Sequence, residues 1–249
     1  MTKIATMVAV LLVLAAATAH ALEVSVKPFY WSPDLDTRMR VEQDNIGDEI
    51  DLSSDLGMDD EDIYGATIDL GFGRSSHVIL SYWTVDYSGN EVIARDLRYD
   101  GRTYDAGSRV RSDFDFDAYE LGYAFDLVNF ESFYAGLVLQ LNAFIIDTEL
   151  RSNLLPIPDE EDFNLIYPLP AIRFGYRFFN NKAELGGKFG GLWWQGSGWW
   201  DASAELAVYP IKNLGLSAGY RFLHYDISDD DDSINFKMDG FTASAVLRF

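Results

Sequence analysis

The chain ends in FTASAVLRF, residues 241–249, and the side chains of this stretch alternate in character. Every second residue is apolar: Phe241, Ala243, Ala245, Leu247 and Phe249. The residues between them are small or polar, with Val246 as the exception. Because successive side chains of a β-strand point to opposite faces, this period of two predicts a strand with one apolar face. The strand would end on an aromatic carboxy-terminal residue.

The other end of the chain has the pattern of a secretory signal peptide. A positively charged start at Lys3 is followed by an apolar run over residues 8–17 and by the small-x-small site Ala19-His20-Ala21. The apolar run is too short for a helix that crosses a bilayer, which needs about 20 residues. We therefore predict a signal peptide over residues 1–21, removed on export, and one mature domain over residues 22–249. An uncleaved anchor is the alternative.

The same alternation recurs along the rest of the chain. It predicts ten strands, over residues 23–31, 63–73, 77–87, 112–127, 133–147, 165–178, 183–194, 199–209, 214–227 and 236–249. One face of nearly every strand is apolar and rich in aromatic residues, whereas the other holds glycine, serine and charges. Pro168 and Pro170 lack the N–H that a ladder uses, so we expect an irregular, loop-like start to the sixth strand.

This pattern predicts an all-β fold, a transmembrane antiparallel up-and-down β-barrel of about ten strands. The connections alternate between short and long, which matches short periplasmic turns and longer extracellular loops and places both termini in the periplasm. Eight or twelve strands are alternatives, because residues 37–41 could form part of an extra strand. A soluble β-sandwich or lipocalin-like barrel is the alternative fold, but such a protein would bury its apolar face inside.

The strand pattern, the signal peptide and the terminal Phe249 together resemble the small Gram-negative outer-membrane β-barrels of the OmpA, OmpX and OmpW class. The resemblance implies that the mature protein lies in the outer membrane, in contact with outer-membrane lipid and lipopolysaccharide. It also implies that the barrel assembly machinery reads Phe249 as an assembly signal. We expect a monomer. The resemblance selects no single family within this class.

Acidic residues dominate the charge of the chain. It has 40 Asp and Glu residues against 19 Lys and Arg, for a net charge of −21. Binding of nucleic acid is disfavoured, because phosphates require a basic surface. The chain has no cysteine, so it can form neither a disulfide nor a thiolate metal site.

Strand parity assigns twelve charged side chains to the lumen: Glu23, Lys27, Asp69, Glu120, Arg173, Arg177, Glu184, Lys188, Asp201, Glu205, Arg221 and Arg248. Isolated charges in a confined interior are costly, so this equal number of acids and bases predicts ion pairs across a narrow lumen. We expect a plugged lumen held by a charge network of Glu120, Arg173, Arg177, Glu184, Lys188, Glu205 and Arg221. A small selective pore lined by these charges is the alternative.

Acidic residues are densest in the predicted extracellular loops. Residues 32–62 contain twelve acids, and Asp229–Asp232 adds four in a row. Carboxylate oxygens are the ligands that Ca²⁺ and Mg²⁺ prefer, so Asp55, Asp59, Asp60 and Asp62 are candidate ligands of a divalent cation. The spacing matches no EF-hand loop, and a solvated, mutually repelling loop is the default interpretation. No other cofactor is expected.

Four tryptophans flank the segment Gln195–Gly198. A tight turn there would place Trp194 opposite Trp199 and Trp193 opposite Trp200. Strand parity sends Trp193 and Trp200 to the lipid side, where we expect them to form an aromatic girdle with Tyr220. Stacking on carbohydrate is the functional alternative.

Enzymatic machinery is sparse in the mature sequence. His77 and His224 are its two histidines, and His224 has the lipid-facing parity of Tyr220 and Phe222. We therefore expect no enzyme, and predict a structural or surface-binding role. The alternatives are a narrow porin or channel for small solutes, and an outer-membrane lipid A-modifying enzyme or protease.

Overall fold

The structure is a computed structural model, and it describes residues 22–40, 47–99, 102–152, 159–194, 196–229 and 232–249. The predicted signal peptide and the centre of the acidic run at residues 229–232 lie outside the described residues. The described residues form thirteen β-strands. None of them forms a helix long and apolar enough to span a membrane.

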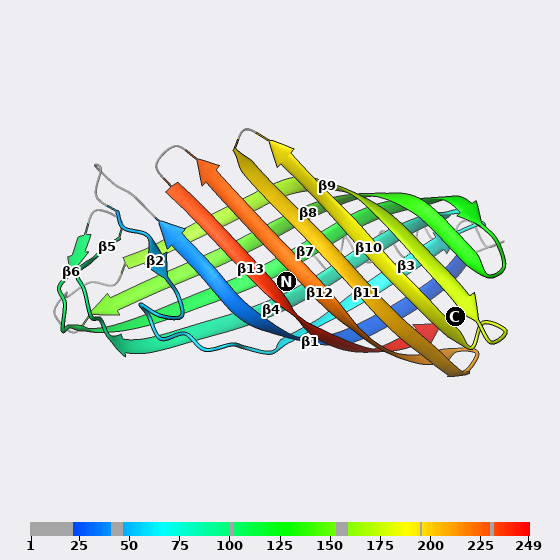
Figure 1. Cartoon of the computed structure of the whole chain (residues 1–249), viewed down its shortest axis with the longest axis horizontal. Coiled ribbons are helices and arrows are strands. Elements are labelled where there is room, and N and C mark those ends of the chain that lie inside the picture. The colour runs from blue at the N-terminus through cyan, green and yellow to red at the C-terminus, as the bar shows by residue number, and fades with distance from the viewer. Residues whose placement is uncertain (1–21, 41–46, 100–101, 153–158, 195, 230–231) are drawn as a thin grey trace, which may run out of the picture.

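Ten antiparallel strands close into a barrel (Figure 1). The wall strands are β1 (Leu22–Arg40), β3 (Ile63–Phe72), β4 (Ser76–Val92), β7 (Arg109–Asn129), β8 (Phe133–Ser152), β9 (Asp159–Phe178), β10 (Ala183–Trp194), β11 (Ser197–Ile211), β12 (Leu214–Asp229) and β13 (Asp232–Arg248). Each pairs with the next along the chain, and β13 pairs with β1 to complete the ring. The predicted ten-stranded up-and-down barrel is confirmed.

Three short strands lie outside this ring. β2 (Ile50–Asp51) pairs with β1, and β5 (Leu97–Tyr99) forms a hairpin with β6 (Arg102–Tyr104). Figure 1 shows these strands gathered at one end of the barrel, far from the carboxy terminus. The short turns and both ends of the barrel sequence lie at the other end.

The wall strands are longer than the sequence predicted. β1 runs on to Arg40, into the acidic segment at residues 32–62. Residues 88–111, a polar segment between the third and fourth predicted strands, are strand over much of their length and extend that hairpin, as expected. Residues 148–164 and 228–235, which the sequence placed in loops between predicted strands, are largely strand where the structure describes them. These two loops are shorter than predicted because the alternation continues beyond the membrane with its polarity reversed. On β1, for example, Leu35 and Met39 are buried while Asp36 between them is exposed.

β7 shows the reversal within a single strand. Leu121, Tyr123 and Phe125 point outward and are about half exposed. Further along the strand, Asp115 occupies the outward face, while Phe116 points inward and is 1% exposed. We call the part with an apolar outer face the membrane barrel (residues 119–129 of β7) and the part with a charged outer face the outer barrel (residues 109–118 of β7). The outer barrel therefore has the pattern of a water-soluble β-barrel, with an apolar interior and a charged outer face.

The expectation of an irregular start to the β9 strand is also wrong. β9 is continuous, and Pro168 and Pro170 stand opposite Leu141 and Leu139 of β8 in register. β9 accommodates both prolines because its ladder with β10 ends at Ala171, so no β10 partner needs their missing N–H groups.

Candidate functional site

A cluster of buried charges crosses the lumen at the end of the membrane barrel that adjoins the outer barrel. Arg221 Nη2 lies 2.8 Å from Glu120 Oε1 and 3.0 Å from Asp201 Oδ2. Lys188 Nζ lies 2.9 Å from the same Asp201 oxygen, and it also donates to Gln140 Oε1 at 2.9 Å. We call these five residues the central cluster. Strands β7, β8, β10, β11 and β12 each contribute one member, so the cluster links much of the ring.

Two tryptophans join the central cluster to the outer barrel. The guanidinium of Arg221 lies 5.1 Å from the ring centre of Trp31 and 5.9 Å from that of Trp83. Trp83 also donates from Nε1 to Glu120 Oε1 at 3.1 Å. The stacked cation and the charge-assisted hydrogen bond make the central cluster a boundary between the charged and the apolar interior.

Further charges pair near the short turns. Arg173 Nε lies 2.8 Å from Asp126 Oδ1, and His77 Nδ1 lies 2.9 Å from Asp69 Oδ1. Asp126 is 4% exposed, yet neither Asp126 nor His77 belongs to the predicted network. Asp126 follows the outward Phe125, so parity alone could have placed it inside. A break in register between Asp126 and Val128 makes its exact partner unpredictable.

Glu184 is the centre of another group at the same end. It lies 3.4 Å from both Arg177 and Arg248, and Tyr134 donates to it at 3.1 Å. The seven residues predicted as one network are therefore divided among separate groups. The structure brings Glu120, Lys188 and Arg221 together and pairs Arg177 with Glu184. It pairs Arg173 and Glu205 with Asp126 and Lys27, which lay outside the predicted network.

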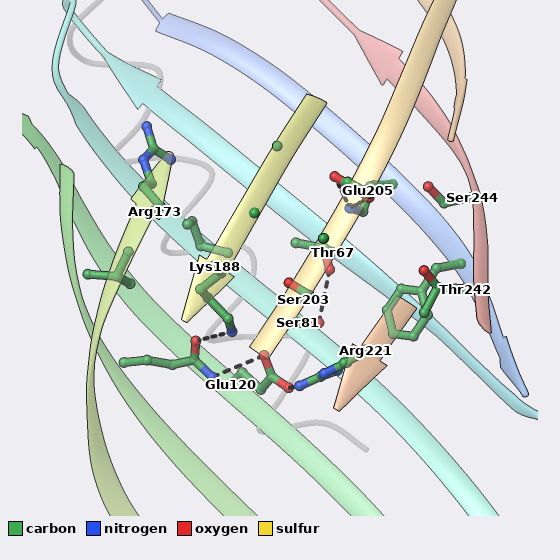
Figure 2. Close-up of a pocket in the computed structure, with 18 of the residues that line it drawn as sticks. Thr67, Ser81, Glu120, Arg173, Lys188, Ser203, Glu205, Arg221, Thr242 and Ser244 are labelled. Carbon is green, nitrogen blue, oxygen red and sulfur yellow. Dashed lines mark hydrogen bonds and ion pairs between the residues drawn. The ribbon is translucent and has the colours of Figure 1, made fainter. Parts of the chain in front are cut away.

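A polar cavity of about 230 Å³ lies within the membrane barrel (Figure 2). Lys27 and Glu205 line it and pair at 2.7 Å, and the central cluster contributes Glu120, Gln140, Lys188 and Arg221. Serine and threonine hydroxyl groups around it come from Thr67, Ser81, Ser203, Thr242 and Ser244. Paired charges and hydroxyls of this kind suit water or a small polar solute.

The interior of the outer barrel is apolar, whereas the sequence predicted an inward face of glycine, serine and charges. Phe116 is its hub, with ring centres 4.7 Å from Phe144, 5.0 Å from Phe236 and 5.1 Å from Trp83. Tyr167 and other buried aromatic and aliphatic side chains continue the same cluster. We call this cluster the aromatic plug. The lumen is therefore blocked by apolar packing in addition to the predicted ion pairs.

Loop residues close the open end of the aromatic plug. Leu52, Leu56 and Met58, between β2 and β3, are buried against it, as are Leu97 and Tyr104 of the β5–β6 hairpin. Exposed ion pairs at the rim join the segments around β2 to those around the β5–β6 hairpin. Asp55 lies 2.7 Å from Arg95, and Asp48 lies 2.7 Å from Arg98. The Arg98 guanidinium is the main cause that holds the pKa of Asp48 below its usual range.

The candidate cation ligands do not converge. Asp55 pairs with Arg95, Asp60 accepts from the backbone N–H of Leu35 at 2.7 Å, and Asp62 accepts from the Tyr30 hydroxyl at 2.7 Å. Asp59 is exposed. Across the part of the chain that the structure describes, no group of three or more His, Asp or Glu side chains could hold a metal ion. Asp55, Asp60 and Asp62 instead fix loop and strand ends to the barrel.

The outer wall of β4, β7 and β8 carries a cross-strand row of acids. Asp115 stands directly between Asp86 and Asp147. Its pKa is raised, first by partial burial and then by the charges of Asp86 and of the neighbouring aspartates. Like charges directly opposite one another destabilise a sheet. The row therefore opposes folding at neutral pH.

Asp115→Asn should stabilise the barrel by about 0.2–1 kcal/mol at neutral pH, because it removes this repulsion. The gain should fall toward zero as the pH drops through the raised pKa of Asp115, since the protonated side chain no longer repels its neighbours. The urea-unfolding midpoint in detergent, measured from pH 3 to 8, tests this. Asp36→Asn is the matched control, because Asp36 stands opposite Lys237 and its loss should destabilise. A gain that does not depend on pH would contradict the charge explanation.

The girdle residues lie on the outer face. Trp193 is 60% exposed, Tyr220 41% and Trp200 37%. The predicted hairpin pairing is wrong, because the turn is shorter than expected: Trp194 pairs with Ser197, and Trp200 pairs with Gly191. Gly196 makes this tight turn with a φ of +92°, a conformation that favours glycine.

The remaining predicted positions are also placed. Phe249 is 76% exposed, and its N–H donates to the Val24 carbonyl at 2.9 Å across the β13–β1 closure. Of the two histidines, His77 is in the charged lumen and His224 stacks on Phe222, with ring centres 6.2 Å apart. The histidines are thus held in different environments.

No protein-family model and no curated protein matches the chain. Among solved structures, it is similar to the attachment invasion locus protein Ail of Yersinia pestis, determined with the heparin analogue sucrose octasulfate, at 15% identity and a TM-score of 0.40, covering 92% of this chain and 100% of that one. It is similar to OprG of Pseudomonas aeruginosa at 11% identity and a TM-score of 0.46, covering 92% and 96%. It is also similar to the β-domain of the Bordetella autotransporter BrkA at 11% identity and a TM-score of 0.49, covering 92% and 99%.

Sequence identities and TM-scores this low transfer no function to this chain. The fold class therefore rests on the barrel itself. The ten wall strands form a closed ring, because β13 pairs with β1, and the outer face of the membrane barrel is apolar. The chain has the fold of a small outer-membrane β-barrel.

Proposed function

We propose that this protein is a closed, non-conducting barrel with a structural or surface-binding role. The observation that carries the proposal is the aromatic plug, which fills the outer barrel where a pore would need water. A void inside it, lined by Phe116, Phe144 and Phe236 among others, measures about 10 Å³. That is about the least space that holds one water molecule. The polar cavity below therefore meets an apolar barrier on its outer side.

Recognition would then fall to the outer barrel, which presents charged side chains beyond the membrane. Surface segments on a rigid scaffold are the usual carriers of binding function. We expect the membrane barrel to contact outer-membrane lipid and lipopolysaccharide, the assembly machinery to read Phe249, and the protein to act as a monomer without catalysis. These expectations follow from the resemblance and from the exposed apolar face.

Single-channel recording tests the closed barrel. The refolded full-length mature protein in planar bilayers should give no conductance steps at neutral pH in 1 M KCl, whereas a general porin in the same bilayers should. Insertion is verified by heat-modifiable mobility of the protein recovered from the membrane. Reproducible steps from the inserted barrel would overturn the proposal and favour a narrow pore through the cavity.

A further inference from the structure

The polar cavity of the membrane barrel has more basic than acidic side chains in its wall. The bases are Lys27, Arg173, Lys188 and Arg221, and the acids are Glu120 and Glu205. Asp126 and Asp201, which pair with Arg173 and Lys188, are not among the lining residues. The chain as a whole has a net charge of −21, so this wall differs in sign from the rest of the protein. The cavity therefore presents mainly cationic groups to a solute.

Both acids in this wall already use their carboxylate oxygens. Glu205 accepts from Lys27 Nζ at Oε1 and at Oε2, over 2.8 and 2.7 Å. Glu120 accepts from Arg221 at Oε1 and from Gln140 at Oε2, over 2.8 and 3.1 Å. A cationic solute would have to compete with these donors, and the four bases of the wall would repel it. The cavity is therefore unsuited to a cation.

The donors in the wall are not all used. A lysine ammonium has three N–H groups, and Lys188 directs two of them, each over 2.9 Å, to Gln140 and Asp201. Ser203 stands opposite Lys188 in the register of β10 and β11 (Figure 2). The hydroxyl groups of Ser203 and Thr242 form no hydrogen bond with any residue that the structure describes. Because side chains directly opposite in a sheet share a face, Lys188 and Ser203 offer adjacent donors.

Gly186 leaves space beside these donors. It lines the cavity and precedes Lys188 by two residues, so both lie on the inward face of β10. A Cβ atom on Gly186 would meet no heavy atom closer than 3.6 Å. The cavity volume of about 230 Å³ is roughly that of eight water molecules in the liquid. Phe29, Ile79 and Val138 add apolar surface to the wall. The space therefore suits a small solute that has both an acceptor group and an alkyl part.

The open space in the lumen lies toward the short turns. The side chain of Asp201, in the central cluster, is 1% exposed. The side chain of Glu205, beside the cavity, is 36% exposed, and that of Arg248, near the end of β13, is 40% exposed. These side chains face the lumen, so their exposure reflects the room around them. In the predicted orientation this is the periplasmic side, since the aromatic plug closes the other end.

We propose that the cavity binds a small organic carboxylate with a short alkyl chain, which enters from the periplasm. The carboxylate oxygens accept from Lys188 Nζ and the Ser203 hydroxyl, and hydrogen bonds between charged groups are the stronger ones. The alkyl part lies beside Gly186, against the apolar part of the wall. A neutral amide of the same shape lacks the charge that the bases favour. Inorganic phosphate has the charge but leaves the apolar wall without a partner.

Unfolding of the refolded wild-type barrel in a non-ionic detergent tests the class of ligand. Butyrate is the probe, and butyramide, butylammonium and inorganic phosphate are compared with it at an ionic strength matched with NaCl. Butyrate should raise the urea-unfolding midpoint by mass action, phosphate should raise it less, and the amide and the amine should leave it unchanged. No rise with butyrate, or an equal rise with butyramide, would overturn the proposal. An equal rise with phosphate would overturn the assignment to an organic carboxylate.

A glycine pair places the site. Gly186→Val fills the space beside Lys188 with an isopropyl group and should weaken butyrate binding by about tenfold or more, measured by calorimetry. Gly71→Val is the matched control. Gly71 also has room for a Cβ atom, with its nearest neighbours at 3.5 Å, but it does not line the cavity. Its replacement should leave the affinity unchanged. Equal affinity in wild type and folded Gly186→Val would refute the placement.

A serine pair tests the donor without filling the cavity. Ser203→Ala should weaken butyrate binding several-fold, because the carboxylate loses a hydrogen bond. Ser217→Ala should not, since the Ser217 hydroxyl bonds to Glu205 and Ser244 and does not line the cavity. Heat-modifiable mobility verifies that each variant folds, and this pair decides the placement if Gly186→Val does not. Unchanged affinity in Ser203→Ala would contradict the proposed contact. The conductance test of the closed barrel is independent of these results.

Discussion

Replacing Asp201 with Asn should destabilise the barrel by about 3–5 kcal/mol, the usual cost of leaving buried charges without their partner. The Asp201 side chain is 1% exposed and pairs with both Lys188 and Arg221. Its loss leaves two cations in the lumen with Glu120 as their remaining partner in the central cluster. The urea-unfolding midpoint of the refolded barrel measures the effect.

A second variant separates a buried pair from solvated charges. Asp201→Asn with Lys188→Met removes one acid and one base and leaves Arg221 paired with Glu120. This double variant should be more stable than Asp201→Asn alone, since no charge lacks a partner. Glu205→Gln should cost less than Asp201→Asn, because Glu205 is 36% exposed beside the cavity. Additive costs in the double variant would show that water screens the lumen charges.

The membrane barrel could be predicted from sequence because one rule governs it. Leu121, Tyr123 and Phe125 are all apolar and point outward. This period of two does not depend on which side chains meet inside the barrel. The outer barrel obeys the same period, but its exposed acids suggested loops. Asp34 and Asp36 alternate with Pro33 and Leu35 in a regular strand. Alternation was therefore a better guide to strands than charge.

Side-chain partners depended on information that parity does not carry. Parity identified Glu205 as inward, but its partner Lys27 lies 178 residues away and is set by barrel closure. Asp126 depends on a local break in register, and the tryptophan pairing depends on the length of one turn. The aromatic plug was not predicted, because members such as Trp31 and Phe236 stand at the ends of predicted strands. Inward and outward faces were assigned from the middle of each strand, and the reversal of polarity occurs near its end.

Replacing Phe116 with Ala should destabilise the barrel by about 3–5 kcal/mol, the range for a buried Phe in a close-packed core. Phe116 is 1% exposed and contacts the rings of Trp83, Phe144 and Phe236. Removing its ring loses the transfer free energy of the side chain and leaves a cavity. Phe125→Ala is the control on the same strand. Phe125 is 45% exposed toward lipid, which fills the space, so its loss should cost less.

The cavity in Phe116→Ala also distinguishes a dry core from a wet lumen. An apolar cavity stays empty of water and takes up a small aromatic molecule such as benzene. Benzene should therefore raise the unfolding midpoint of Phe116→Ala by mass action, and leave that of Phe125→Ala unchanged. A wet lumen would behave differently. Phe116→Ala would then be nearly neutral, benzene would have no effect, and the inserted barrel would conduct ions. Those results together would refute the closed barrel.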